Sequence, residues 1–342
     1  MAIESIENES NMSERFRSYS FVLIALFLSS VSLSLTKGIM IPFILAVFLA
    51  FILQPAIDKF EDKLKVRRSI AIVMVFIILL TLSAGLFITI GASLKQIVNN
   101  AAVYQSRITS LVESGVQIVA QFDGDFDQAQ LQEMIRELPF FTALKTISNA
   151  LIKGVSDFFL VSIFTLFILS GSKISLPDTG FWPQINKSIR TYLLTKTVTS
   201  ASTGIITAII LKMLGLDMAM MFGMLACFLN FIPTFGSVFA TLLPIPIAML
   251  QFENPVLIAL TIALPGSIQF LVGNLIEPKI MGKSLDLHPV TILLSLMFWG
   301  FLWGVPGMIL ATPITVIIRI FLQSNPSTEG FAEYMAGRFN WN

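Results

Sequence analysis

The sequence predicts an all-α polytopic membrane protein with about six spanning helices, two helical hairpins broken by Pro and Gly, and an extracytoplasmic helical arm. Hydrophobic residues make up 55% of the 342 residues and charged residues only 13%, about half the share in soluble proteins. The mean hydropathy is +0.82. Thirty Phe accompany only four Tyr, as expected of helices whose aromatic side chains face lipid. Residues 69–94 contain no charged side chain and are long enough to cross a bilayer.

The first 94 residues predict a tail followed by scaffold helices. Residues 1–17 are polar and are expected to form a disordered cytoplasmic tail, and residues 18–94 to form the N-terminal transmembrane scaffold. Two apolar runs of this scaffold meet at a predicted tight turn, Thr36-Lys37-Gly38. The short segment 58–68 carries five Lys and Arg residues. Because such loops stay in the cytoplasm, both termini are placed there.

Residues 95–154 predict an extracytoplasmic amphipathic arm. Its apolar side chains follow one another at spacings of three and four, the pattern of a coiled-coil seam, at Leu94, Ile97, Ala101, Tyr104, Ile108, Leu111, Gly115, Ile118 and Phe122. The alternative is a pair of amphipathic helices lying on the membrane surface. The polar face carries little Lys or Arg, so the strict seam favours packing against protein.

A hydroxyl-rich helix opens the last part of the chain. The remaining segments are a spanning helix with its cytoplasmic connector, a transport core and a cytoplasmic tail, at residues 155–188, 189–322 and 323–342. The first core helix, 189–214, is rich in Thr and Ser. These hydroxyls either hold helices together or line a hydrated pathway, to which Thr197 and Ser200 would belong.

Two apolar stretches of the core have halves too short to cross the membrane. Their arms of 14 or 15 residues extend about 21–22 Å, against a hydrocarbon core of about 30 Å. The first stretch is interrupted by NFIPTFG at residues 230–236, where Asn230, Pro233 and Gly236 are expected to shape a tip. Hairpin or hinge positions are expected at Pro278, Gly282, Trp299, Gly300, Gly304, Gly307 and Pro313.

Paired Pro- and Gly-interrupted segments of this kind are typical of re-entrant hairpins at a transport site. The first hairpin would enter from outside and the second from inside, an inverted arrangement suited to alternating access. Tilted full spans with ordinary proline kinks are the alternative.

Glu277 is the leading ionisable candidate in the core. It follows a long uncharged span, and Pro278 disfavours helical geometry at Glu277. An acid at such a break can bind a proton or cation with help from Asn274. The alternative is an ion pair with Lys279 or Lys283 at the cytoplasmic interface.

Several function classes lack the residues that they need. A net charge of +1 without long basic blocks argues against nucleic-acid binding. The single cysteine, Cys227, is expected to be a small packing residue, and the single histidine, His288, a helix-cap or interface residue. No nucleotide-binding, metalloprotease or serine-hydrolase motif occurs. We therefore predict no enzyme, no catalytic residue, no metal site and no cofactor apart from a coupling ion, H⁺ or Na⁺.

Four segments resemble the AI-2E family of bacterial transporters. They are PFILAVFLAFILQP at 42–55, NFIPTFG at 230–236, NLIEPKIMG at 274–282, and LSLMFWG with GVPGMILATP at 294–313. The resemblance covers roughly residues 20–322. It implies a multi-pass protein of the bacterial inner membrane whose relatives are described as autoinducer-2 exporters or sodium(lithium)/proton antiporters. It also implies a homo-oligomer, a pentamer, with an elevator-like movement of the half that bears the hairpins.

The resulting hypothesis is a secondary transporter that exports a small polar solute of the autoinducer-2 type. Its pathway residues would be Asn230, Pro233, Gly236, Asn274, Glu277, Thr197 and Ser200. A sodium(lithium)/proton antiporter, with Glu277 first and Asp217 second as the coupling acid, is the alternative. A non-transporting membrane scaffold is the second alternative. The expected partners are the solute or a monovalent cation, the lipid bilayer and further copies of the chain, but no nucleic acid.

Overall fold

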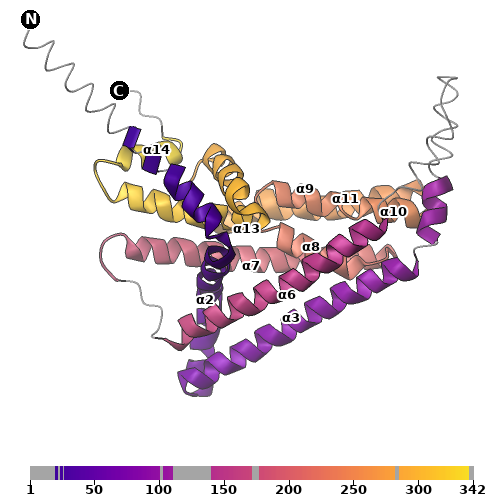
Figure 1. The fold of residues 1–342 in the computed structure, drawn as a ribbon, viewed down its shortest axis with the longest axis horizontal. Helices are drawn as coiled ribbons and strands as arrows, with labels where there is room; N and C mark the ends of the chain where they lie inside the picture. Colours follow the sequence, from indigo (N-terminus) through magenta and orange to yellow (C-terminus); the bar gives the residue numbers. More distant parts are fainter. Residues whose placement is uncertain are drawn as a thin grey trace, which may run out of the picture.

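The computed structural model describes residues 20–21, 24–25, 27–100, 103–110, 140–171, 177–281 and 285–338, with the backbone alone at 140–152. This part of the chain is helical and contains no strand. Its named elements are α2 (Lys37–Leu64), α3 (Arg68–Asn99), α6 (Phe140–Ser170), α7 (Trp182–Met213), α8 (Ala219–Leu229), α9 (Phe235–Leu242), α10 (Ile245–Gln251), α11 (Pro255–Leu271), the π-helix η1 (Val272–Ile276), α12 (Glu277–Met281), α13 (Pro289–Gln323) and α14 (Glu329–Met335) (Figure 1).

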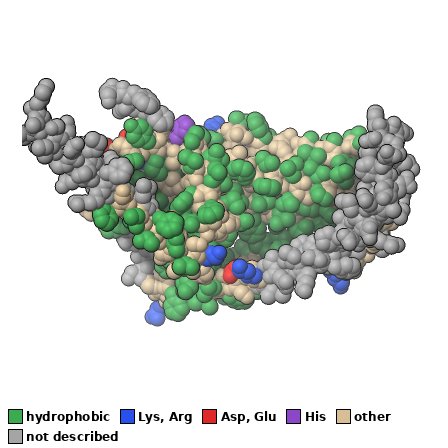
Figure 2. Space-filling view, turned by 45° about the horizontal axis from the view of Figure 1, so that its top comes forward, with side chains coloured by type: hydrophobic (Ala, Val, Ile, Leu, Met, Phe, Trp, Pro, Cys, Tyr) green, Lys and Arg blue, Asp and Glu red, His purple; other side chains and the backbone are tan. Residues whose placement is uncertain are grey.

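Within the described residues, six helices are long and apolar enough to cross a membrane. They are Lys37–Leu64, Arg68–Asn99, Lys153–Ser170, Trp182–Met213, Pro255–Met281 and Pro289–Gln323. Large apolar side chains such as Ile77, Phe167 and Phe301 are exposed, and hydrophobic side chains predominate over the described part of the face in Figure 2. The predicted all-α polytopic membrane fold is confirmed.

The predicted turn at Thr36-Lys37-Gly38 is wrong. Thr36 alone interrupts the helix, which resumes at Lys37. Both the amide and the hydroxyl of Thr36 donate to the Ser32 carbonyl, while its own carbonyl accepts from the amides of Ile39 and Met40. The ladder of hydrogen bonds therefore passes through this position, where a reversal would have broken it.

Three N-terminal helices share a core of their own. Buried side chains of α2, α3 and α6 form one cluster, at Ala50, Ile57, Ala71, Ile72, Val75 and Leu169. In Figure 1, α3 and α6 run side by side and α2 crosses their direction. Most of the predicted arm, including seam positions from Leu111 to Phe122, lies outside the described residues. Residues 103–110 are helical, and Tyr104 and Asn100 donate to the carboxylate of Asp217 at 2.9 and 3.2 Å.

Helices α7 and α8 pack with their backbones close together. A Cβ on Gly204 would lie 2.6 Å from Cβ of Cys227, and a Cβ on Gly223 would lie 2.4 Å from Cβ of Ala208. The half-buried Cys227 is thus one of the small residues that permit this contact. Helix α7 begins at Trp182, seven residues before the predicted start at 189, because Pro183 in its first turn lacks an N–H that would have no partner there anyway.

The first hairpin consists of α8 against α9 and α10. Its tip, residues 230–234, ends with Thr234 in a left-handed conformation (φ 61°). A Cβ on Gly236 would lie 1.7 Å from the Leu229 carbonyl oxygen, so only glycine lets the second arm approach the end of the first. At the base, the Gln251 amide group donates to the Gly215 carbonyl at 2.6 Å and accepts from the Asp217 amide at 2.7 Å.

The second hairpin lies within α13. Gly304 has φ 65° and ψ −144°, a conformation accessible almost only to glycine, and the chain folds back there. A Cβ on Gly307 would lie 2.0 Å from the Trp299 carbonyl oxygen. The two arms therefore approach each other as closely here as they do at Gly236. The Trp303 indole N–H donates to the Leu33 carbonyl at 3.1 Å, which connects this tip to the N-terminal helix.

The bases of the two hairpins lie at opposite ends of α7. Leu211, near the end of α7, shares a buried cluster with Met218 and Ala248 from the base of the first hairpin. Phe181, just before α7, packs its ring on Phe321 of the second hairpin at 5.7 Å between centroids. A helix of 32 residues is about 48 Å long, so the hairpins extend toward each other from well-separated ends.

We predict that Gly236→Ala and Gly307→Ala each destabilise the protein, because the new methyl group meets a backbone carbonyl that cannot rotate away. Overpacking of this kind costs about 1–3 kcal/mol, which should lower the melting temperature of the purified protein by several degrees. Gly91→Ala is the matched control, since a Cβ there meets open space and alanine favours the helix. An unchanged melting temperature in both tip variants would contradict the hairpin geometry.

Candidate functional site

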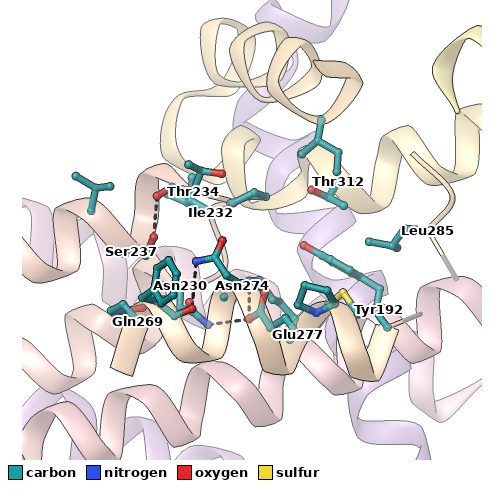
Figure 3. Close-up of a pocket in the computed structure, with 18 of the residues that line it drawn as sticks. Tyr192, Asn230, Ile232, Thr234, Ser237, Gln269, Asn274, Glu277, Leu285 and Thr312 are labelled. Atoms are coloured by element: carbon teal, nitrogen blue, oxygen red, sulfur yellow. Dashed lines mark hydrogen bonds and ion pairs between the residues drawn. The ribbon is translucent and has the colours of Figure 1, made fainter. Parts of the chain in front are cut away.

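A pocket of about 800 Å³ lies between the tip of the first hairpin, the segment from α11 to α12, and α13. Figure 3 shows Asn230, Asn274 and Glu277 close together, with Tyr192 and Thr312 on the side toward Leu285. The wall of the pocket combines apolar side chains with amide, hydroxyl and charged groups. This composition suits a small molecule with several polar atoms.

The carboxylate of Glu277 is the centre of the polar wall. Its two oxygens accept from Lys196 Nζ at 2.8 and 2.7 Å. One of them also accepts from Thr199 Oγ1 at 2.8 Å and from Asn230 Nδ2 at 3.2 Å. Asn230 Nδ2 additionally donates to Ser200 Oγ at 3.0 Å. Three elements, α7, the first hairpin tip and α12, therefore converge on one carboxylate.

This ion pair is buried among helices. Glu277 is 9% exposed and Lys196 5%, and Lys196 lies near the middle of the 32-residue helix α7. The alternative pairing of Glu277 with Lys279 does not occur, because Lys279 is exposed and Lys196 takes its place. Lys283 lies outside the described residues. The Lys196–Glu277 pair as a whole carries no net charge.

A π-helix delivers Glu277 to this position. The expectation that Pro278 breaks the helix at Glu277 is wrong, since Glu277 has helical angles (φ −58°, ψ −51°). Instead, the chain stays helical through the π-helix η1, and the Glu277 amide donates to the carbonyl of Val272, five residues back. Single π turns inside α-helices occur often at functional sites because they rotate one side chain out of register.

Gln269 is a buried amide without a hydrogen-bond partner. It is 4% exposed and lines the pocket, and neither its Oε1 nor its Nε2 has a partner among the described residues. A buried primary amide without partners is costly. The side chain thus has both a donor and acceptors to offer to a molecule in the pocket.

The predicted pathway residues are only partly brought together. Asn230, Pro233, Asn274, Glu277 and the hinge residue Pro278 line the pocket. Ser200 supports Asn230 from behind, Thr197 donates to the carbonyl of Leu193 in its own helix, and Gly236 packs at the hairpin tip.

The remaining predicted hinge residues do not line the pocket. Trp299, Gly300, Gly304 and Gly307 shape the second hairpin, and Pro313 lies beside the lining residue Thr312. Gly282 lies outside the described residues. Asp217 is held by Asn100 and Tyr104 at the base of the first hairpin.

The sequence interpretation missed Lys196, Gln269, Tyr192 and Thr312 as part of the site. Lys196 carried a usable signal: it is the cation nearest the middle of its spanning helix, and a Lys at such a position needs an acidic partner such as the Glu of another span. Gln269, likewise, is a polar side chain in a long apolar span. His288 caps α13 by accepting from the Val290 amide at 3.3 Å.

The model of the AI-2E family transporters matches residues 20–326. The chain is similar to the AI-2 transport protein TqsA of Escherichia coli K12, 29% identical over 86% of this chain and 88% of that protein. It is also similar to a putative transport protein of Borreliella burgdorferi (27%, covering 93% and 90%) and to the putative transport protein YrrI of Bacillus subtilis (25%, covering 84% and 86%).

Three observations indicate the same class of protein. Six described helices can cross a membrane, two glycine-tipped hairpins lie beside a polar pocket, and the family match covers most of the length. The chain therefore belongs to the AI-2E family of transporters and is a multi-pass membrane transport protein.

Proposed function

We propose that this protein is a secondary transporter of the inner membrane that exports a small, uncharged polar solute of the autoinducer-2 type. The pocket beside the first hairpin would be the solute site. One relative carries AI-2 transport in its name, which supports the solute class.

One observation carries this proposal: the pocket is polar but has no unpaired charge on its buried wall. Glu277 is neutralised by Lys196, whereas the Gln269 amide is buried and has no partner in the part of the chain that the structure describes. A neutral molecule with several hydroxyl groups can bond to such an amide without leaving a charge unpaired. An anion or cation would have to disrupt the ion pair first.

The arrangement of the hairpins supports alternating access of the elevator type. Buried side chains of α2, α3 and α6 form a core of their own, while α2 also packs Phe48 into the cluster of the second hairpin and α3 packs Ile97 against the cluster at the base of the first. The N-terminal helices would form the static scaffold, and the hairpin-bearing half would carry the pocket. The re-entrant nature of the hairpins, their insertion from opposite membrane sides and the homo-oligomer are parts of the same proposal.

We predict that Gln269→Leu lowers export of labelled autoinducer-2 from proteoliposomes by about ten-fold, because one or two hydrogen bonds to the solute are lost. The melting temperature should stay equal or rise, since an apolar group replaces a buried amide without partners. Thr207→Val is the matched control: its hydroxyl is also buried without a partner among the described residues, but it does not line the pocket. Equal export by wild type and Gln269→Leu would contradict the site.

Sodium(lithium)/proton antiport is the second candidate, and the Lys196–Glu277 pair favours it. A sodium or lithium ion can replace the Lys196 ammonium at the Glu277 carboxylate, one positive charge for another. The site stays neutral if Lys196 loses one proton as the ion binds. Thr199 Oγ1, within hydrogen-bond distance of the same carboxylate, would supply a further oxygen ligand.

We predict for this candidate that a sodium jump outside proteoliposomes changes the internal pH, and that Glu277→Gln abolishes the change. Glu277→Gln leaves a buried ammonium unpaired, which costs about 3–5 kcal/mol and could act through folding alone. The double variant Lys196→Met/Glu277→Gln should therefore regain melting temperature but not exchange.

Failure of folded wild type to carry either solute would contradict both candidates and support the scaffold interpretation. A sodium-dependent pH change that survives in Glu277→Gln would remove this pair from the ion pathway.

A further inference from the structure

A second cavity, of about 550 Å³, lies between the first turns of α7, the last turns of α13 and Arg338, three residues beyond the end of α14. It is lined by three cationic side chains, Lys187, Arg319 and Arg338, and by one acidic side chain, Asp286. The transport proposal does not use these cations. The cavity is therefore predominantly basic, and it adjoins the transport pocket, with which it shares Met281 and Asp286.

The buried Arg319 has donors to spare. Its side chain is 2% exposed, and one terminal nitrogen donates to Asp286 at 2.5 Å. Its Nε–H is buried without a partner among the described residues. A guanidinium group donates up to five hydrogen bonds in a planar fork that matches an oxyanion, so Arg319 is incompletely used by Asp286.

The other two cations are accessible from the same cavity. Arg338 pairs with Glu333 at 3.0 Å and with Asp286 at 2.8 Å, and both carboxylates raise the pKa of its guanidinium, so it stays charged. Lys187 is exposed and has no ion-pair partner among the residues that the structure describes. Within the lining, three positive charges thus face one negative charge.

The aromatic side chains near this cavity are of the kind that occur at the edge of a membrane. Trp182 begins α7 and stacks on Phe181 at 4.9 Å, and Phe181 contacts Phe321. Trp at the start of a spanning helix is typical of the headgroup level. Phe321 is 60% exposed, so a lipid chain can lie along α13 while its headgroup reaches the cavity. Basic pockets between spanning helices bind phospholipid headgroups in this way.

We propose that this basic cavity binds a phosphate group, carried by an anionic phospholipid headgroup or free in solution. Arg319 would bind it through its unused donors, and Lys187 and Arg338 would bind it from the open side. Asp286 lines the transport pocket as well as this cavity. A phosphate bound to Arg319 and Arg338 therefore competes for these cations with Asp286, a residue that lines both cavities.

The test measures the melting temperature of the purified full chain in neutral detergent during titration with phosphatidylglycerol, phosphatidylcholine or inorganic phosphate. Phosphatidylglycerol, inorganic phosphate or both should raise the melting temperature, and phosphatidylcholine should not. A shift with the lipid alone identifies the headgroup as the source, and a shift with inorganic phosphate alone identifies a free anion. The proposal would be overturned if neither phosphatidylglycerol nor inorganic phosphate shifted the melting temperature. It would also be overturned if phosphatidylglycerol and phosphatidylcholine shifted it equally.

Lys187→Gln and Arg338→Gln should each lower the affinity for the ligand that raises the melting temperature by about ten-fold, because each removes a charged hydrogen bond to the phosphate. Arg190→Gln is the matched control, an exposed cation of the same helix that does not line the cavity. Lys187 has no ion pair to lose among the described residues, so its variant reports on binding even if Arg338→Gln disturbs the C-terminal helix. Unchanged titrations in Lys187→Gln would also overturn the site.

Discussion

A carboxylate and an ammonium group buried among apolar helices depend on each other, because neither can be desolvated alone without a cost of several kcal/mol. Lys196 and Glu277 satisfy this constraint at 2.7 Å. Thr199 and Asn230 occupy further lone pairs of the carboxylate. As Asn230 belongs to the first hairpin tip, the pair also fixes where that tip lies against α7. The pocket exists between groups that this one interaction holds in place.

The hairpins meet a second constraint, the need to reverse the chain between two closely packed arms. A side chain at the reversal would collide with the backbone of the opposite arm. Both tips solve this with a glycine that packs directly on a carbonyl of the opposite arm, Gly236 on Leu229 and Gly307 on Trp299. At the first tip, the side chain of Asn230 also contributes to the site, since it donates to Glu277 and Ser200.

Local sequence patterns predict most of the fold. Charge-free runs indicate the spanning helices, and Pro and Gly interruptions indicate both hairpins, because these signals act over a few residues. The Lys196–Glu277 pair joins residues 81 positions apart, and local patterns hold no information about such a distance. The errors have similar causes: Pro278 indicates a break that a π turn avoids, and Thr36-Lys37-Gly38 indicates a reversal that continued helical hydrogen bonding prevents.

The neutral Lys196–Glu277 pair also bears on how the pocket could open to one side of the membrane and then to the other, as proposed above. An unpaired carboxylate carried through a low-dielectric region meets a desolvation penalty at every step, whereas a neutral ion pair that moves with its donors keeps most of its interaction energy. Lys196, Asn230 and Glu277 come from three elements that surround the pocket, so a movement that keeps these elements together preserves the pair. A movement of one element past the others would separate the charges. Under the proposed alternating access, the ion pair therefore favours displacement of α7, the first hairpin and α12 as one body over independent gating by the hairpin alone.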